Sequence, residues 1–226
     1  GTINTSFGLI RITRVHLEED TAKLQHTILD GNKVTLVDFN RSSVPLVEIV
    51  TEPDITSAKQ AKDYAQKIHR LVRYLGVSDA DMEKGSMRVE ANISWGLDLG
   101  YKVEVKNINS FRFLEKAIDY ELSRQKTMLD RGETPVQETR GWNETQAVTY
   151  SQRTKEGAAD YRYFPEPDIP PMIFSDDEIK TLKDSLPELP DSLKNKLISL
   201  GVREDYIDIF ISDANKAKFV LALIST

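Results

Sequence analysis

The sequence contains no cysteine, no long apolar run and no excess of basic residues, and each absence excludes a class of protein. Without cysteine, the 226-residue chain can form no disulfide, no thiolate nucleophile and no cysteine-based zinc site, which is compatible with a reducing compartment. No apolar run approaches the roughly 20 residues of a membrane span, and no signal-peptide pattern opens the sequence. The formal net charge is −6, so any RNA contact must be local or must come from another part or partner.

The remaining composition is that of a folded globular protein. Charged residues make up 29% and hydrophobic residues 39% of the chain, and its length allows one large domain with a smaller neighbour. From Asp176 onward, short helical patterns are interrupted by Pro187, Pro190 and Gly201. We therefore predict one domain at 1–175 and the start of a small all-helical domain at 176–226. Because the chain lacks an initial methionine and stops within an apolar helical pattern, we expect it to be a piece of a longer protein.

Hydrophobic periodicity predicts an α+β fold with helices packed on a mainly antiparallel sheet. Three early segments have the alternation or apolar character of strands: 9–17, 33–39 and 45–51. Gly31 and Asn32 form a turn signal between strands. Ser57 and Ser110 are predicted N-caps of two long helices that end near Leu75 and Arg131. Further extended segments are expected at 138–140 and 145–152.

A predicted β-hairpin between residues 85 and 111 organises this layout. Its two alternating runs flank a glycine-bounded loop, residues 96–100. If the loop closes symmetrically, Asn92 lies opposite Glu104 and Glu90 lies opposite Lys106, with Arg88 on the same face. Two interpretations stay open from the pattern alone: a solvated face with salt bridges, or a site for a metal ion and a polyanion.

Two other acidic positions have a structural and a functional interpretation. Glu48 interrupts the apolar segment 45–51 and projects between Leu46 and Val50, where an unpaired carboxylate is costly. It is either a metal ligand or an exposed residue of an edge strand. The acidic run in His16–Asp20 is either a solvated turn or part of a metal site. The proline-rich segment Asp160–Pro171 is either a rigid linker or a loop that frames a site.

Several phrases, in this order, resemble the B-subunit family of tRNA-dependent glutamyl/aspartyl amidotransferases. They are HLEED (16–20), LVDFNRSSVPLVEIVTEPD (36–54), GSMRVEANIS (85–94), EVKNINSF (104–111), QETR (137–140) and DYRYFPEPDIPP (160–171). The related archaeal glutamyl-tRNA amidotransferase subunit is an alternative. The resemblance implies a catalytic domain with a glutamine synthetase-like fold, followed by a helical domain.

The resemblance also implies a reaction and partners. Such a subunit uses ATP and Mg²⁺ to phosphorylate the side-chain carboxylate of Glu on tRNA(Gln) or Asp on tRNA(Asn), and ammonia then forms the amide. A glutaminase A subunit supplies the ammonia and a small C subunit completes the complex, with misacylated tRNA as substrate and no membrane partner. The expected location is the bacterial cytoplasm, or the mitochondrial matrix or plastid of a eukaryote.

Site residues follow from the motif positions and from the predicted hairpin. The metal ligands carried over are Glu19, Glu48 and Glu90, although many relatives have aspartate at the last position. The catalytic candidates are Glu90, Glu104, Lys106 and Arg88, and the two cations are assigned to phosphate mainly from the hairpin geometry. The nucleotide-binding candidates are Lys106, Arg88, Asn92 and Arg162, with Asp168 as a weaker candidate near the last.

Two features of the family are expected to lie outside this sequence. A Glu-x-His segment with a metal-binding histidine would precede Gly1, and His16 is not its replacement; a tRNA-binding tail domain would follow residue 226. Two rival functions are a non-catalytic tRNA-binding scaffold and a free-standing amide ligase for a small amino acid. The retained acids argue against the first, and the helical extension after residue 175 argues against the second.

Overall fold

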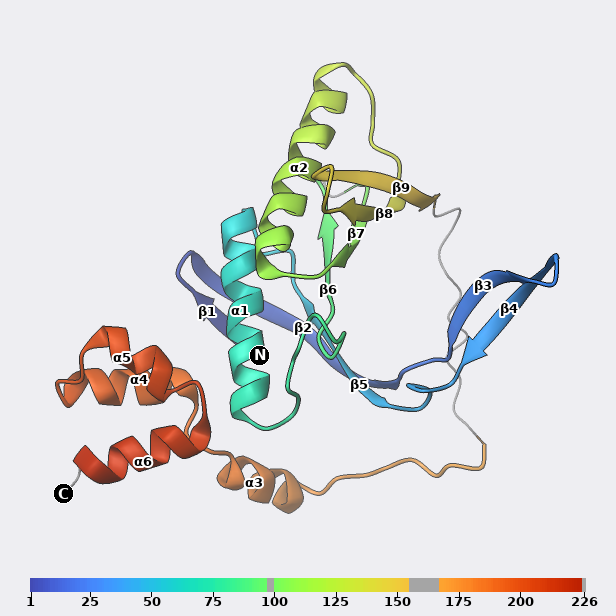
Figure 1. Cartoon of the computed structure of the whole chain (residues 1–226). Coiled ribbons are helices and arrows are strands. Elements are labelled where there is room, and N and C mark those ends of the chain that lie inside the picture. The colour runs from blue at the N-terminus through green and yellow to red at the C-terminus, as the bar shows by residue number, and fades with distance from the viewer. Residues whose placement is uncertain (97–99, 155–166, 225–226) are drawn as a thin grey trace. The chain divides into compact units, whose positions relative to one another are not determined.

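The computed structural model describes residues 1–96, 100–154 and 167–224 (Figure 1). These residues form two compact units, Gly1–Tyr64 and Ala65–Thr226, and each is described by itself. The domain boundary predicted between residues 175 and 176 does not coincide with the division between these two units, and it stays a prediction. In the part of the chain that the structure describes, no helix is long and apolar enough to cross a membrane.

The first unit consists of two antiparallel sheets and the beginning of a helix. Its elements are β1 (Thr2–Thr5), β2 (Gly8–Glu19), β3 (Lys23–Leu29), β4 (Asn32–Asp38), β5 (Pro45–Thr51) and the start of α1 (Ala58–Tyr74). Strands β1, β2 and β5 form one sheet, and β3 and β4 form a two-stranded hairpin. The hairpin turns at Asp30 and Gly31, which both have positive φ angles of 49° and 79°, as a type I′ turn requires. The predicted turn is therefore confirmed, one residue earlier than the signal was placed.

The second unit contains a four-stranded sheet, one long helix and a group of short helices (Figure 1). Its elements after α1 are β6 (Val89–Ile93), β7 (Val103–Ile108), α2 (Phe111–Asp130), β8 (Glu138–Asn143), β9 (Val148–Thr154), α3 (Asp176–Ser185), α4 (Pro190–Ser199), α5 (Glu204–Phe210) and α6 (Ala214–Ile224). The strand order is β6-β7-β8-β9; the outer pairs are antiparallel, while β7 and β8 are parallel and are joined through α2. The predicted α+β class with mainly antiparallel pairing is confirmed.

The core of the second unit lies between α2 and one face of this sheet. Ser110 begins the helix as predicted, because its side chain accepts a hydrogen bond from the Phe113 amide at 3.1 Å. Buried residues from both layers are Ile93, Val103, Val105, Ile108, Leu114, Ala117, Ile118 and Trp142. We call the α2-covered face of the sheet the inner face and the opposite one the outer face.

The central hairpin is confirmed but is shorter than its alternation predicts. Strand β6 ends at Ile93 and β7 begins at Val103, although the pattern extends to Trp95 and Tyr101. The Trp95 amide donates instead to the side chain of Gln125 on α2, at 2.8 Å, and so leaves the strand ladder. Loop residues 97–99 lie outside the described residues.

The short helices predicted after residue 175 are also present. Ser175 and Glu178 form a capping box at the start of α3. Leu193, Leu197, Ile207, Ile211 and Ala217, from the end of the chain, pack with Tyr74 of α1 in a second buried cluster. The Tyr74 hydroxyl donates to the Glu188 carbonyl at 2.9 Å, which ties the end of α1 to the segment before α4.

Candidate functional site

Two rows of side chains cross the outer face of the four-stranded sheet. Strand register places Asn92 opposite Glu104, and Glu104 beside Thr139. The next row begins at Glu90 on β6, continues to Lys106 on β7 and reaches Gly141 on β8. Because alternate residues of a strand share a face, both rows lie on the side opposite α2. The predicted pairing of Asn92 with Glu104 is therefore confirmed, whereas Glu90 meets Lys106 at a register shift of the strand pair. Strand β8 adds residues that the hairpin alone did not include.

Lys106 lies between two carboxylates in this array. Its ammonium nitrogen is 3.2 Å from Glu90 Oε1 and 3.5 Å from Glu104 Oε1. Burial acts to lower the pKa of Lys106, but the charges and hydrogen bonds of Glu90 and Glu104 outweigh it and raise that pKa. The site therefore holds a fixed cation at neutral pH, flanked by two acids.

Two β-bulges border the array. On β7, Lys106 and Asn107 together oppose Glu90, and Asn107 has a φ of 61°. This extra residue shifts the alternation by one position, so that Ile108 is buried at the inner face while Lys106 stays on the outer face. On β9, Gln152 is the extra residue opposite the step from Thr139 to Arg140. Bulges of this kind redirect side chains near functional sites.

Tyr150 fills the position that Gly141 leaves open. A Cβ atom added at Gly141 would lie 2.6 Å from Tyr150 Cζ, so the ring crosses β8 directly above the glycine. The Tyr150 hydroxyl accepts a hydrogen bond from Gln152 at 3.2 Å. An aromatic ring laid over a glycine of the neighbouring strand stabilises the strand pairing. We assign Tyr150 this structural role.

The inner face carries a second ion cluster, which is buried beneath α2. Glu121 contacts Arg124 at 2.7 Å and also accepts hydrogen bonds from Gln125 and Thr149, each at 2.8 Å. Glu138 contacts Arg140 at 2.6 Å. Glu121 is fully buried, which was not predicted from the sequence. Its place between Ile118 and Gln125 on the apolar stripe was the available signal.

The carried-over acids of the first unit lie on β2 and β5. Glu48 is opposite His16, and its carboxylate is 2.6 Å from an Arg14 guanidinium nitrogen. Glu19 is opposite Pro45, three residues from Glu48, so strand alternation places Glu19 and Glu48 on opposite faces of the β2–β5 pair. The ion pair with Arg14 offsets the cost of the Glu48 charge. The metal-ligand roles of Glu19 and Glu48 stay predictions.

The remaining candidates lie outside the two rows. Arg88 is exposed one residue before β6, and Asp168 is exposed in a turn. Arg162 lies outside the described residues. The roles assigned to these residues also stay predictions.

The residue types on the outer face fit a Mg²⁺ ion that arrives with phosphates. Within the three described ranges, no group of three or more His, Cys, Asp or Glu side chains could hold a metal ion. Mg²⁺ needs few protein ligands, however, because it commonly binds through one or two carboxylates together with phosphate oxygens and water. Glu90 and Glu104 supply two carboxylates that both approach one cation, the Lys106 ammonium.

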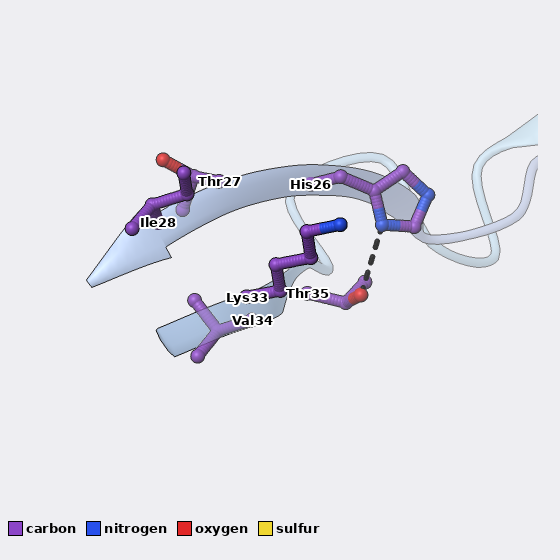
Figure 2. A pocket seen from close by; sticks show the side chains of 6 residues that line it. All are labelled: His26, Thr27, Ile28, Lys33, Val34 and Thr35. Atoms are coloured by element: carbon purple, nitrogen blue, oxygen red, sulfur yellow. Dashed lines mark hydrogen bonds between the residues drawn. The ribbon is translucent and has the colours of Figure 1, made fainter. Parts of the chain in front are cut away.

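A shallow hollow on the β3–β4 hairpin is a poorer candidate (Figure 2). Its lining residues are His26, Thr27, Ile28, Lys33, Val34 and Thr35. His26 Nδ1 and Thr35 Oγ1 form a hydrogen bond of 2.9 Å across the two strands (Figure 2). The imidazole of His26 is therefore already bonded to another residue of the hairpin. No carboxylate lines this hollow in the described chain.

Sequence comparisons match the chain to one protein family. A family model described as "GatB/GatE catalytic domain" matches residues 2–180. A protein of Thermosipho melanesiensis is 49% identical over 218 residues, which are 93% of this chain and 46% of that protein. One of Trichodesmium erythraeum is 47% identical over 230 residues, or 98% of this chain and 47% of that protein. One of Roseiflexus is 52% identical over 193 residues, which are 84% of this chain and 39% of that protein.

All three relatives are named as the B subunit of an aspartyl/glutamyl-tRNA(Asn/Gln) amidotransferase. The chain spans about half the length of the curated relatives it matches. The similarity therefore includes the matched domain and leaves the other half of those proteins without a counterpart in this sequence.

Proposed function

The chain belongs to the family of the GatB/GatE catalytic domain, and on that premise we propose that it is the catalytic part of a tRNA-dependent amidotransferase subunit. The relatives' names support a substrate in which aspartate or glutamate is attached to tRNA(Asn) or tRNA(Gln). The structural observation that carries the proposal is the cation of Lys106 fixed between Glu90 and Glu104 on the outer face of the sheet.

The proposed reaction has two steps. A side-chain carboxylate oxygen of the aminoacyl group attacks the terminal phosphorus of ATP, the bond from that phosphorus to the bridging oxygen breaks, and ADP leaves. Ammonia then attacks the acyl carbon and phosphate leaves, so that the amide forms. The first step is needed because a free carboxylate would have to expel oxide, whereas an acyl phosphate expels phosphate.

Lys106 is proposed to bind the transferred phosphoryl group. Negative charge on the phosphoryl oxygens must be stabilised during the transfer, and a preorganised cation is an effective way to do so. An ordinary lysine is already protonated at neutral pH, and Glu90 and Glu104 raise the pKa of Lys106 further. Its two carboxylate partners hold it in place, since free rotation of a lysine would weaken that stabilisation.

Glu90 and Glu104 are proposed to hold the Mg²⁺ ion that accompanies ATP. The bound ion would neutralise phosphate charge. Glu19 and Glu48 remain proposed ligands from their family motifs, and Arg88, Asn92 and Arg162 remain proposed nucleotide contacts. A glutaminase A subunit, a small C subunit and misacylated tRNA are the proposed partners, supported by the names of the relatives, which describe one subunit of a larger enzyme.

The test uses the complete protein that contains this chain, assembled with its partner subunits. The complex receives misacylated tRNA and ATP without glutamine, and hydroxylamine is added. We expect ADP to form and a hydroxamate to accumulate on the tRNA-bound amino acid, because an acyl phosphate reacts readily with good nucleophiles. Absence of both products until glutamine is supplied would contradict the proposed order of steps.

A pair of variants links this activity to the outer face. Glu104→Gln keeps the side-chain volume and removes the charge, so we expect hydroxamate formation to fall by about 100-fold or more, the scale for losing one electrostatic group. Glu133→Gln makes the same chemical change at an exposed position just after α2 and serves as the control. Equal rates for the two variants would remove Glu104 from the proposed mechanism.

A further inference from the structure

Thr139 makes a directed contact with one oxygen of Glu104. Its hydroxyl donates to Glu104 Oε2 at 3.0 Å, while Glu104 Oε1 faces the Lys106 ammonium. Thr139 is only 5% exposed, so little solvent competes for this hydrogen bond. The two oxygens of Glu104 therefore have different partners, and this fixes the rotation of the carboxylate plane.

The residues on either side hold Thr139 in this orientation. Glu138 and Arg140 point to the inner face and pair with each other at 2.6 Å. Arg140 also donates to the Thr149 side chain at 2.8 Å, which anchors β8 to β9 beneath α2. With both neighbours held inward, Thr139 must face outward. The bulge at Gln152 lies at this same step of the strand pair.

Strand propensity alone would explain a threonine here, but it would explain a valine equally well. The two residues have nearly the same shape and differ in the hydroxyl. In this structure the Thr139 hydroxyl bonds a carboxylate of the candidate site rather than a backbone group. Substituting valine therefore separates the contribution of the hydroxyl from that of the shape.

We infer that Thr139 is a positioning residue that orients Glu104 for the proposed phosphorylation of the substrate's side-chain carboxylate. This inference rests on the proposed function, since it assigns a role within that reaction. Thr139 acts through Glu104 and needs no contact with substrate. A residue that orients a functional carboxylate in this way commonly contributes about 10- to 100-fold to activity.

Thr149 supplies a matched control within the same sheet. Like Thr139 it is buried, at 4% exposure, and its hydroxyl donates to a carboxylate, Glu121 Oε2, at 2.8 Å. It differs in facing the inner cluster. Thr149→Val therefore removes this bond and the one that Arg140 Nε donates to the same hydroxyl. Arg140 keeps its bonds to Glu138 and to the Thr149 carbonyl, so it stays on the inner face.

The experiment measures ADP and hydroxamate formation by the complete complex carrying Thr139→Val, Thr139→Ser or Thr149→Val. We expect Thr139→Val to lower kcat by about 10- to 100-fold with little change in the KM for tRNA. Thr139→Ser, which keeps the hydroxyl, should remain within about threefold of the unmodified complex on the same scale. Thr149→Val should lower the unfolding temperature but leave kcat per folded molecule unchanged.

The possible failures are distinguishable. If the unmodified complex is active and Thr139→Val equals it, the inference about Thr139 is overturned and the proposed function stands. The inference is also overturned if Thr139→Ser is as impaired as Thr139→Val, or if Thr149→Val lowers kcat as much. If the unmodified complex forms neither ADP nor hydroxamate, the proposed function fails and the inference fails with it.

Discussion

The two faces of the four-stranded sheet each carry an ion cluster, and the clusters differ in what remains available for binding. On the inner face, the side chains of Glu121, Glu138 and their two arginines are between 0% and 19% exposed. On the outer face, Glu90 and Lys106 are 42% and 38% exposed, whereas Glu104 is 15% exposed. The inner cluster is therefore enclosed by the protein, while Glu90 and Lys106 of the outer cluster remain accessible to a ligand, as the proposed function requires.

The inner cluster also has more hydrogen bonds and ion pairs within the protein than the outer cluster. Glu121 is bonded by two arginines, a glutamine and a threonine within the protein, so its hydrogen-bonding capacity is used. Glu90 and Glu104 share one lysine, and a metal ion could displace that ammonium from Glu90 at little cost because the Glu90–Lys106 pair is exposed and such pairs are weak. Breaking the inner cluster should therefore affect folding, and breaking the outer one should affect chemistry.

The largest expected effect comes from removing the centre of the inner cluster. Glu121→Ala leaves Arg124 and Arg140 short of a buried acceptor, and breaking such a pair from one side costs about 3–5 kcal/mol of stability. Urea unfolding of the complete protein would measure this loss. Activity per folded molecule should be retained, and a change in unfolding free energy below about 1 kcal/mol would contradict the structural role of the cluster.

The converse change is made at the outer cluster. Lys106→Met removes the ammonium and keeps an unbranched chain, so ADP formation by the complete complex should fall about 100-fold, the scale for losing one electrostatic group. Unfolding free energy should change by less than about 1 kcal/mol, because Lys106 and Glu90 are partly exposed and Glu104 keeps its hydrogen bond from Thr139. The control Lys102→Met changes an exposed lysine just before β7. A large loss of stability with full activity would reverse the assignment of the two faces.

Glu138 of the inner cluster should make a smaller contribution to stability that depends on pH. Burial acts to raise the pKa of Glu138, but hydrogen bonds from Ser151 and Arg140 outweigh it and lower that pKa. The pKa of glutamate in the unfolded chain is about 4.3, and the pKa of Glu138 in the folded protein lies below its unfolded value. The ionised Glu138 therefore stabilises the fold fully above the unfolded-state pKa, and this stabilisation is lost as the pH falls through the folded-state pKa. The stability difference between the unmodified protein and Glu138→Gln should therefore be full at neutral pH and shrink under acid conditions. A difference that is constant across this pH range would contradict the shift.

Local features of the fold were predictable from the sequence. Ser57 and Ser110 begin their helices as predicted, because capping depends on residues within one turn. The pairing of Asn92 with Glu104 followed from alternation across a single hairpin. In these cases the residues that decide the structure are close together in the chain.

Long-range pairing was not predictable in the same way. Thr139 meets Glu104 only because β8 pairs in parallel with β7 after the α2 connection, and no local pattern specifies that neighbour. The bulge at Asn107 interrupts an alternation that is otherwise regular. Glu121 was missed because a charged residue on an apolar stripe is ordinarily assigned to the surface, whereas here Arg124 and Arg140 make its burial tolerable.

All of the proposed chemistry depends on the outer face of the sheet binding the reacting nucleotide. The most direct measurement is a crystal structure of the complete complex with a non-hydrolysable ATP analogue and Mn²⁺ in place of Mg²⁺, because the anomalous signal of Mn²⁺ locates the metal. We predict a peak bound by at least one of the carboxylates of Glu90 and Glu104, with the terminal phosphate within reach of Lys106. A bound nucleotide whose metal and phosphates touch none of these residues would contradict this assignment.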